Sequence, residues 1–521
     1  MKLLILCALT ISAAAFAGEC ENLASLKLKD TTITTSTVAA GAFQPPDGRA
    51  NEAYKNAPAF CRVQAVATPA PDSHIEFEVW LPVSGWNGKY FGIGNGGFAG
   101  SIQYNLMAAA LINGYASSST DTGHKGPATT ADWALGHYEK IVDFAYRAIH
   151  ETADKSKAVI QNYYGHGAKH AYFAACSNGG RQGLMEAQRF PADYDGIISG
   201  APANNWTHNF AGFIWDQQAL QGDAQIPAAK MTAIENAALA ACDALDGVKD
   251  GVIDDPRQCH FDPSALLCKG GDSDLCLTAP QVAALQKIYA GPRNSKGKSI
   301  FPGYVPGGEA GPGGWSRWVT GADSQQYVFG YGFFTNMVFD KRDWDLRTFD
   351  FERDMKITDD KMARLFNATD PNLKAFKDRG GKLFIYHGWS DTAIAPANAI
   401  LYYESVVSKM GAKPTGDFFQ LYMVPGMQHC AGGPGPNAFG TNPSPAPSDA
   451  EHSMSIALDR WVDQGIPPSQ IIATKYKRGA NPESGVERTR PLCPYPRVAQ
   501  YTGSGSIDEA ANFKCENSKG K

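Results

Sequence analysis

The segment YFAACSNGGRQGLMEAQRF, residues 172–190, decides the fold, because a tight glycine-rich turn joins an apolar, strand-like run to a helix-like run. Ser177 stands at the turn. A nucleophile elbow needs small residues two before and two after its serine, since larger side chains would collide where the strand turns into the helix. Those residues are Ala175, where the usual pattern has glycine, and Gly179. The segment predicts a nucleophilic serine; the alternative is a serine in an ordinary glycine-rich loop.

The flanking sequence alternates strand-like with helix-like segments, which predicts an α/β fold with a parallel sheet. A long helical pattern covers 132–164 and another covers 397–410. Strand patterns cover 75–81, 90–94, 171–176, 382–388 and 417–426.

The amino-acid composition changes between the strand patterns 171–176 and 382–388, and this change predicts the domain boundaries. From about Asn205 to Arg379 the chain is rich in Gly, Pro, Trp and Asp, with little strand-helix alternation. We expect residues 18–204 and 380–521 to form a catalytic core and residues 205–379 to form an inserted lid domain. A chain of 521 residues is long enough for two such units.

An aspartate and a histidine follow the later strands in the order that α/β-hydrolases use. Asp391 comes after strand 382–388, and His429 comes after strand 417–426. Open α/β sheets bind ligands at the carboxyl ends of their strands. Taken singly, Asp391 is as easily a turn-capping residue and His429 a loop histidine; together, in this order, they predict a Ser-His-Asp triad with Ser177.

The cysteines support this grouping. Cys176 adjoins Ser177 and Cys430 adjoins His429, and a disulfide between them would hold their Cα atoms within about 7 Å. Short separations favour local pairing of Cys242 with Cys259, Cys268 with Cys276, and Cys493 with Cys515, although separation alone does not fix the connectivity.

The N-terminus predicts export. Lys2, an apolar run to Ile11 and the sequence Ala15-Phe16-Ala17 are typical of a signal peptide, residues 1–17, with cleavage after Ala17. The mature chain would keep ten cysteines, an even number that suits an oxidising compartment. We expect a secreted or periplasmic protein with no membrane-spanning segment. A net charge of −5 without basic runs also argues against nucleic-acid binding.

The Cys-Ser elbow, the later Asp and the His-Cys pair together resemble the tannase and feruloyl esterase family, which includes mono(2-hydroxyethyl) terephthalate hydrolases. The resemblance covers the mature chain, including CDALDGVKDGVIDDP. It implies an α/β-hydrolase core with a lid. It also implies five disulfides, Cys20–Cys61, Cys176–Cys430, Cys242–Cys259, Cys268–Cys276 and Cys493–Cys515.

Serine esterase chemistry assigns the remaining roles. His429 would take the Ser177 proton while Asp391 orients the imidazole, and an acyl-enzyme would form. The oxyanion needs backbone N–H donors. We expect one from Asn178 and one from Gly96 or Gly97, in the loop after strand 90–94.

An acidic loop precedes Cys259. Asp243, Asp246 and Asp250 lie within eight residues, but their spacing is not that of an EF-hand, so solvated turns are an equal reading of the pattern. The resemblance implies a structural Ca²⁺ held by these three side chains and by the carbonyls of Val248 and Val252.

Aromatic residues concentrate in the expected lid, where Trp315, Trp318 and Phe334 are candidates for binding an aromatic acyl group, although most such rings belong to a lid core. Arg317 and Arg342 are candidate partners for a substrate carboxylate or phenol.

The leading hypothesis is an exported serine esterase that cleaves small-molecule, feruloylated or galloylated esters of aromatic acids. The first alternative is hydrolysis of mono(2-hydroxyethyl) terephthalate or a related aryl monoester. Two other classes stay open: an inactive calcium-dependent binding protein, and a serine peptidase. The sequence does not reveal the acyl group or the oligomeric state.

Overall fold

The computed structural model describes residues 19–321, 323–441 and 446–517. The expected signal peptide lies outside these residues. Among the residues described, no helix combines the length and apolarity that crossing a membrane requires.

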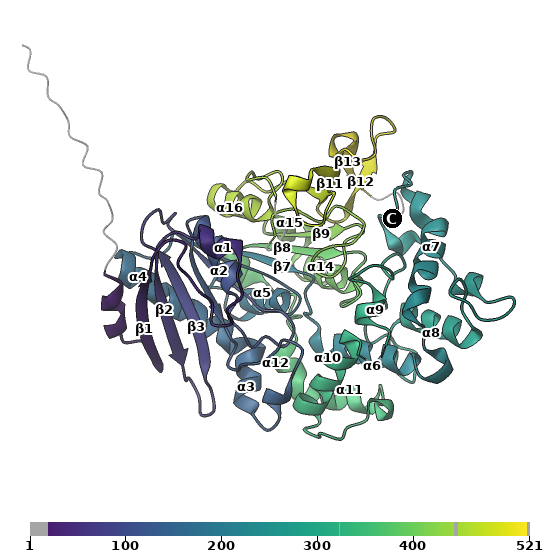
Figure 1. Ribbon diagram of the computed structural model, residues 1–521, viewed down its shortest axis with the longest axis horizontal. Coiled ribbons are helices and arrows are strands. Elements are labelled where there is room, and N and C mark those ends of the chain that lie inside the picture. The colour runs from purple at the N-terminus through teal and green to yellow at the C-terminus, as the bar shows by residue number, and fades with distance from the viewer. Residues whose placement is uncertain (1–18, 322, 442–445, 518–521) are drawn as a thin grey trace, which may run out of the picture.

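A nine-stranded sheet forms the centre of the molecule (Figure 1). Six neighbouring strands run parallel, in the spatial order β5, β4, β6, β7, β8 and β9. At the other edge β1, β2 and β3 pair antiparallel, and β3 also pairs antiparallel with β5. This arrangement confirms the expected α/β class. In spatial order the strands are β1 (Thr31–Val38), β2 (Phe60–Ala67), β3 (Ile75–Pro82), β5 (Ala116–Thr120), β4 (Lys89–Ile93), β6 (His170–Cys176), β7 (Gly196–Gly200), β8 (Lys382–Gly388) and β9 (Phe419–Val424).

Helices cover both faces of the sheet. One face packs against α4 (Ala148–Tyr164), α5 (Asn178–Arg189) and α14 (Ala397–Met410). The other face packs against α16 (Met454–Gln464) and α2 (Tyr104–Ile112). Burial on both faces explains why β6 and β8 read as continuous apolar runs in the sequence.

The helix expected over 132–164 is interrupted. It consists of a short turn at Asp132–Ala134, α3 (Tyr138–Val142), a wider π-type turn at Asp143–Arg147, and α4. Gly136 has φ +76°, a left-handed conformation that ends the first piece.

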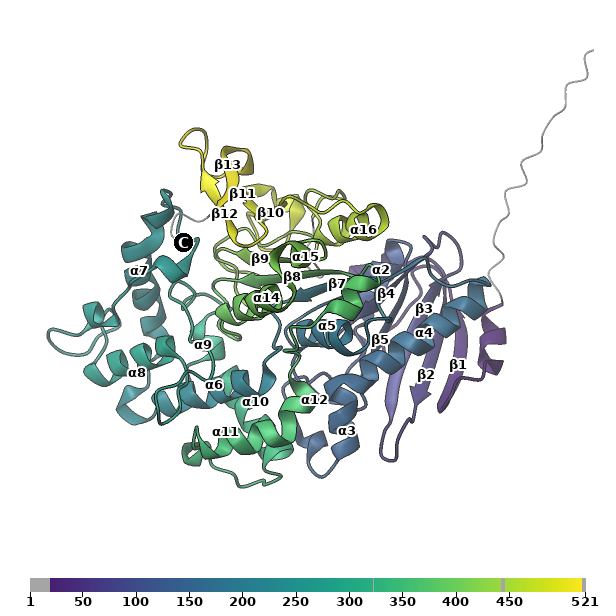
Figure 2. The same ribbon diagram turned by 180° about the vertical axis from the view of Figure 1, so that it is seen from behind.

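The chain between β7 and β8 forms a helical layer beside the sheet (Figure 2). Its aromatic core is continuous with Phe98, Phe144 and Ile394 of the sheet-bearing part, so this layer packs directly over the carboxyl ends of the strands. From Ala368 onwards, side chains already pack against the sheet instead. The helices of the layer are α6 (Trp206–Ala219), α7 (Met231–Cys242), α8 (Ala279–Ala290), α9 (Trp315–Trp318), α10 (Gln325–Phe333), α11 (Arg353–Thr358) and α12 (Arg364–Phe366). The next helix, α13 (Lys374–Asp378), packs against the sheet through Phe376.

Two antiparallel hairpins follow α16 and complete the chain. They pair β10 (Ile471–Tyr476) with β11 (Val486–Leu492), and β12 (Arg497–Tyr501) with β13 (Phe513–Asn517). Two short helices, α1 (Glu52–Asn56) and α15 (Ala412–Gly416), lie in connecting loops. All five expected disulfides are present: Cys20–Cys61, Cys176–Cys430, Cys242–Cys259, Cys268–Cys276 and Cys493–Cys515.

Candidate active site

Ser177 occupies a strained turn between β6 and α5. Its φ of 68° and ψ of −124° lie in a region that residues with a side chain rarely adopt, and such strain is typical of functional sites. Its amide donates to the Gly200 carbonyl at 2.9 Å, which ties the turn to β7. A β-carbon on Gly179 would lie 2.3 Å from the β-carbon of Ala175. The alanine that departs from the usual elbow pattern is therefore accommodated because its partner is glycine.

His429 and Asp391 are joined by a hydrogen bond of 2.8 Å between Nδ1 and Oδ2. The other carboxylate oxygen of Asp391 accepts from the amides of Ala393 and Ile394, at 2.8 and 3.0 Å. Burial by itself raises the pKa of this carboxyl, but the charge of His429 and hydrogen bonds from His387 and His429 hold its pKa well below the usual range. Asp391 is thus an ionised carboxylate fixed on all sides, which suits it to orient an imidazole.

A second histidine, which sequence reasoning missed, contacts the same carboxylate. His387 is fully buried on β8, and its Nε2 lies 3.2 Å from Asp391 Oδ2 and 3.1 Å from the Ile394 carbonyl. Both neighbours are acceptors, so Nε2 carries the proton. The sequence shows a histidine four residues before Asp391, but it lies in the apolar pattern of a buried strand, and that pattern does not indicate a role in the site.

The disulfide Cys176–Cys430 brings the two halves of the site together. Its Cα atoms are 5.9 Å apart although the two cysteines are 254 residues apart in sequence. Ser177 and His429, their direct neighbours, line one cavity of about 320 Å³.

The three residues expected to form the oxyanion hole all line this cavity: Gly96 and Gly97 in the loop after β4, and Asn178 at the start of α5. The amide of Asn95 donates to Gln182 Oε1 at 2.9 Å. This hydrogen bond connects the loop to α5, the helix that begins directly after Ser177. Gly97 has φ +54°, and a β-carbon there would lie 2.3 Å from the Ala128 carbonyl oxygen. Glycine is therefore required at this close approach.

Arg181 holds the first turn of α5. It is fully buried, and its Nε donates to Asn178 Oδ1 at 2.9 Å while its guanidinium lies 5.1 Å from the centre of the Trp206 ring. Burial lowers the pKa of Arg181 to about 9. Backbone carbonyls of Ala145 and Phe144 also accept from it, so this cation is solvated by carbonyls and aromatic rings.

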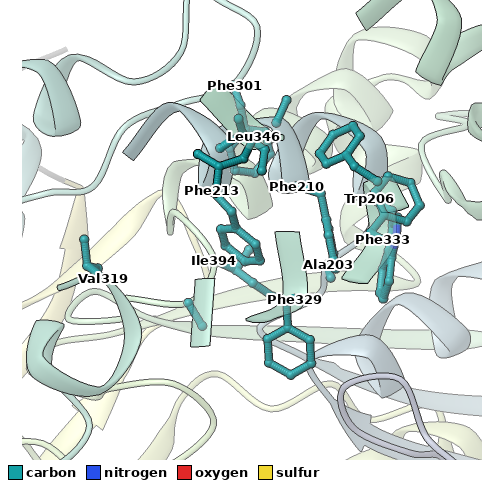
Figure 3. Packing of buried hydrophobic residues seen from close by; sticks show 14 of the residues in the cluster. Ala203, Trp206, Phe210, Phe213, Phe301, Val319, Phe329, Phe333, Leu346 and Ile394 are labelled. Atoms are coloured by element: carbon teal, nitrogen blue, oxygen red, sulfur yellow. The ribbon is translucent and has the colours of Figure 1, made fainter. Parts of the chain in front are cut away.

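Aromatic side chains form most of the cavity wall. Trp318 meets the His429 ring edge-on, with 5.0 Å between ring centres and an interplanar angle of 75°. Figure 3 shows part of this wall within the larger aromatic cluster. The aromatic and aliphatic members missed by sequence reasoning are Trp206, Phe210, Phe213, Phe329 and Ile394.

Two of the aromatic candidates lie elsewhere. Trp315 is fully buried against Tyr289 and Tyr304, and Phe334 packs with Phe333 and Phe349 inside the helical layer. Neither lines the cavity.

Of the two arginine candidates, only one lines the cavity. Exposed Arg317 lines the cavity, whereas Arg342 does not, and its carbonyl accepts from the Tyr331 hydroxyl at 3.0 Å. Of the candidates for substrate contact, Trp318 and Arg317 are therefore retained.

The acidic loop gathers carboxylates after α7. Asp243 accepts from the amides of Asp250 and Gly251, and Asp250 pairs with Arg488 and Arg490. Burial, together with the charges of neighbouring aspartates, raises the pKa of Asp246, Asp250 and the adjacent Asp254.

The donor chemistry of this loop suits calcium. Its aspartates offer hard oxygen donors, and the flanking Cys242 and Cys259 are bonded to each other and so offer no thiolate. A divalent cation would relieve the repulsion among the carboxylates. Asp243, Asp246 and Asp250 thus offer oxygen donors of the kind calcium prefers, and together with the carbonyls of Val248 and Val252 they are the ligand set that the family resemblance implies.

Comparison with known proteins shows that this chain is similar to esterases. A family model described as "Tannase and feruloyl esterase" matches residues 61–516. An uncharacterized esterase of Xanthomonas campestris pv. campestris is 43% identical, and the match covers 98% of this chain and 93% of that protein. The mono(2-hydroxyethyl) terephthalate hydrolase of Piscinibacter sakaiensis is 34% identical, covering 85% and 81%. The crystal structure of feruloyl esterase B from Aspergillus oryzae superposes with a TM-score of 0.88 at 29% identity, covering 96% of this chain and all of that one.

Proposed function

This chain belongs to the tannase and feruloyl esterase family and is a carboxylic ester hydrolase, and we propose that Ser177, His429 and Asp391 are its catalytic triad. The single observation that carries the proposal is the shared cavity: Ser177 on its strained turn and His429, bonded to Asp391, face the same space of about 320 Å³.

The proposed reaction proceeds through an acyl-enzyme. Nε2 of His429 takes the Ser177 proton as Oγ attacks the ester carbonyl, and the imidazolium is stabilised by the ionised Asp391. The backbone N–H of Asn178, with that of Gly96 or Gly97, stabilises the oxyanion; one such donor is worth about 3–4 kcal/mol in comparable enzymes. His429 then gives the proton to the leaving alcohol, and water repeats the sequence on the acyl-enzyme.

The proposed substrates are small esters of aromatic acids, hydroxycinnamic or gallic. Trp206, Phe210, Phe213, Phe329 and Trp318 line the cavity, and aromatic walls favour an aromatic ring through offset and edge-on packing. A cavity of this volume admits an acyl group of one ring.

A second candidate substrate is mono(2-hydroxyethyl) terephthalate. Arg317 lines the cavity with an exposed guanidinium, which can bind a substrate that carries a free carboxylate. A relative named for this activity is 34% identical.

The proposal also includes export and a structural calcium ion. The N-terminal sequence supports export, and five disulfides suit an oxidising compartment. The calcium ion would stabilise the acidic loop and take no part in the ester chemistry.

The test uses the mature protein and its Ser177→Ala variant with methyl ferulate, methyl gallate and mono(2-hydroxyethyl) terephthalate, following release of the acid by chromatography. We expect wild type to cleave the aromatic esters and the variant to lose at least about 10⁴-fold in kcat. The ester with the highest kcat/KM identifies the preferred acyl group. No turnover of any ester by calcium-loaded, disulfide-intact wild type would favour an inactive binding protein. Cleavage of peptides in place of the esters would indicate a peptidase.

A further inference from the structure

One helix contributes a polar residue to the aromatic wall of the cavity. From α6, Trp206, Asn209, Phe210 and Phe213 all line it. Their spacing of three, one and three residues places them on one face of the helix. Figure 3 shows Trp206, Phe210 and Phe213 along this helix. Asn209 is the one member of the face whose side chain is a carboxamide.

The buried position of Asn209 destabilises the folded protein. It is 2% exposed, and within the described part of the chain its Oδ1 has no hydrogen-bond partner. A buried polar atom without a partner destabilises a fold by about 1–3 kcal/mol. The indole N–H of Trp206, one turn earlier, likewise lacks an acceptor among the described residues. Two residues that line the cavity from α6 thus carry a polar atom that no described residue pairs with.

We propose that Asn209 determines specificity by hydrogen-bonding a hydroxyl group on the ring of the acyl moiety. A hydroxyl both donates and accepts, so it can pair with either end of the carboxamide, which exchange places by a half-turn of the side chain. A carboxylate in the same place would find no free cationic partner on this face among the described residues: Arg317 reaches the cavity from α9, and Arg181, which lies against Trp206, already donates to Asn178 and to backbone carbonyls. The inference rests on the proposed function and narrows its substrate class to neutral, hydroxylated aromatic acids.

The test compares two esters that differ by one hydroxyl, methyl 4-hydroxycinnamate and methyl cinnamate. In wild type we expect the hydroxylated ester to have the higher kcat/KM. Asn209→Leu, a replacement of similar volume, should lower the ratio of the two kcat/KM values about tenfold, mainly by slowing the hydroxylated ester. Because leucine also removes the unpartnered oxygen, the variant should unfold at the same temperature as wild type or higher.

Phe213→Leu is the matched control, one turn further along the same face. It should change both esters by a similar factor and leave the ratio near the wild-type value. If Asn209→Leu perturbs folding, Asn209→Thr is a second variant that keeps a polar group. It should keep part of the preference for the hydroxylated ester. An unchanged ratio in Asn209→Leu, or an equal loss on both esters, would overturn the proposal.

A binding measurement separates this inference from the proposed function. The two esters are titrated by calorimetry into Ser177→Ala, with and without Asn209→Leu. A preference for the hydroxylated ester that disappears with Asn209→Leu supports the subsite even if wild type turns over neither ester. If Ser177→Ala with Asn209 intact shows no preference for the hydroxyl, the subsite is refuted even if the triad is catalytic.

Discussion

Removing the disulfide Cys176–Cys430 should destabilise the protein far more than removing Cys268–Cys276. The first closes a separation of 254 residues and the second a separation of 8. A cross-link lowers the entropy of the unfolded chain by an amount that grows as 1.5R times the logarithm of loop length. The difference between the two losses is then 1.5RT ln(254/8), about 3 kcal/mol at 25 °C, and the constant part of the entropy cancels.

The assay is guanidinium unfolding of two double variants, Cys176→Ala with Cys430→Ala, and Cys268→Ala with Cys276→Ala. The second pair lies in the loop between α7 and α8, away from the cavity, and serves as the control. We expect the first variant to have the lower free energy of unfolding by about 3 kcal/mol. Equal values, or the reverse order, would refute the loop-entropy reasoning.

The same variants test whether this disulfide positions the catalytic groups. Because the cysteines adjoin Ser177 and His429, the first variant should lose kcat under conditions where it remains folded, while the control keeps wild-type kcat. Full kcat in the folded first variant would mean that the disulfide only stabilises the fold.

Three further predictions concern His387, Asp121 and the acidic loop. His387→Leu removes a hydrogen bond from the Asp391 carboxylate, so kcat should fall about 10- to 100-fold with little change in KM; wild-type kinetics would exclude a positioning role for His387. Burial raises the pKa of Asp121 to about 8, so in the folded state this carboxyl keeps its proton where the unfolded chain has lost it, and stability should fall as pH rises from about 4 to about 8. Asp121→Asn should reduce this pH dependence, measured as the difference between the free energies of unfolding at pH 5 and pH 8. The same difference in the variant as in wild type would contradict the raised pKa of Asp121. Chelation by EGTA should lower the melting temperature, with recovery in Ca²⁺ but not Mg²⁺ and a smaller response in Asp246→Asn; an identical response in that variant would argue against calcium in the acidic loop.

The sequence alone determined the residues that carry the proposed chemistry. Ser177, Asp391 and His429 each follow a strand, and parallel strands end at one edge of a sheet, so chain order was enough to predict that they meet. The small residues around Ser177 and the cysteines beside Ser177 and His429 are local signals of the same kind. Such signals are readable because turn geometry and cross-links constrain short stretches of sequence.

Only the tertiary structure decided which aromatic side chains line the cavity. Trp315, Phe334, Trp206 and Phe213 are all buried aromatic residues of the helical layer, yet only Trp206 and Phe213 line the cavity. Helical periodicity shows that a face is apolar, but a core and a substrate cavity are equally apolar. The role of His387 depended likewise on the loop between β8 and α14 folding back, which places Asp391 against the strand that precedes it. The cavity wall arises from the packing of segments that are distant in the chain, and no local pattern encodes it.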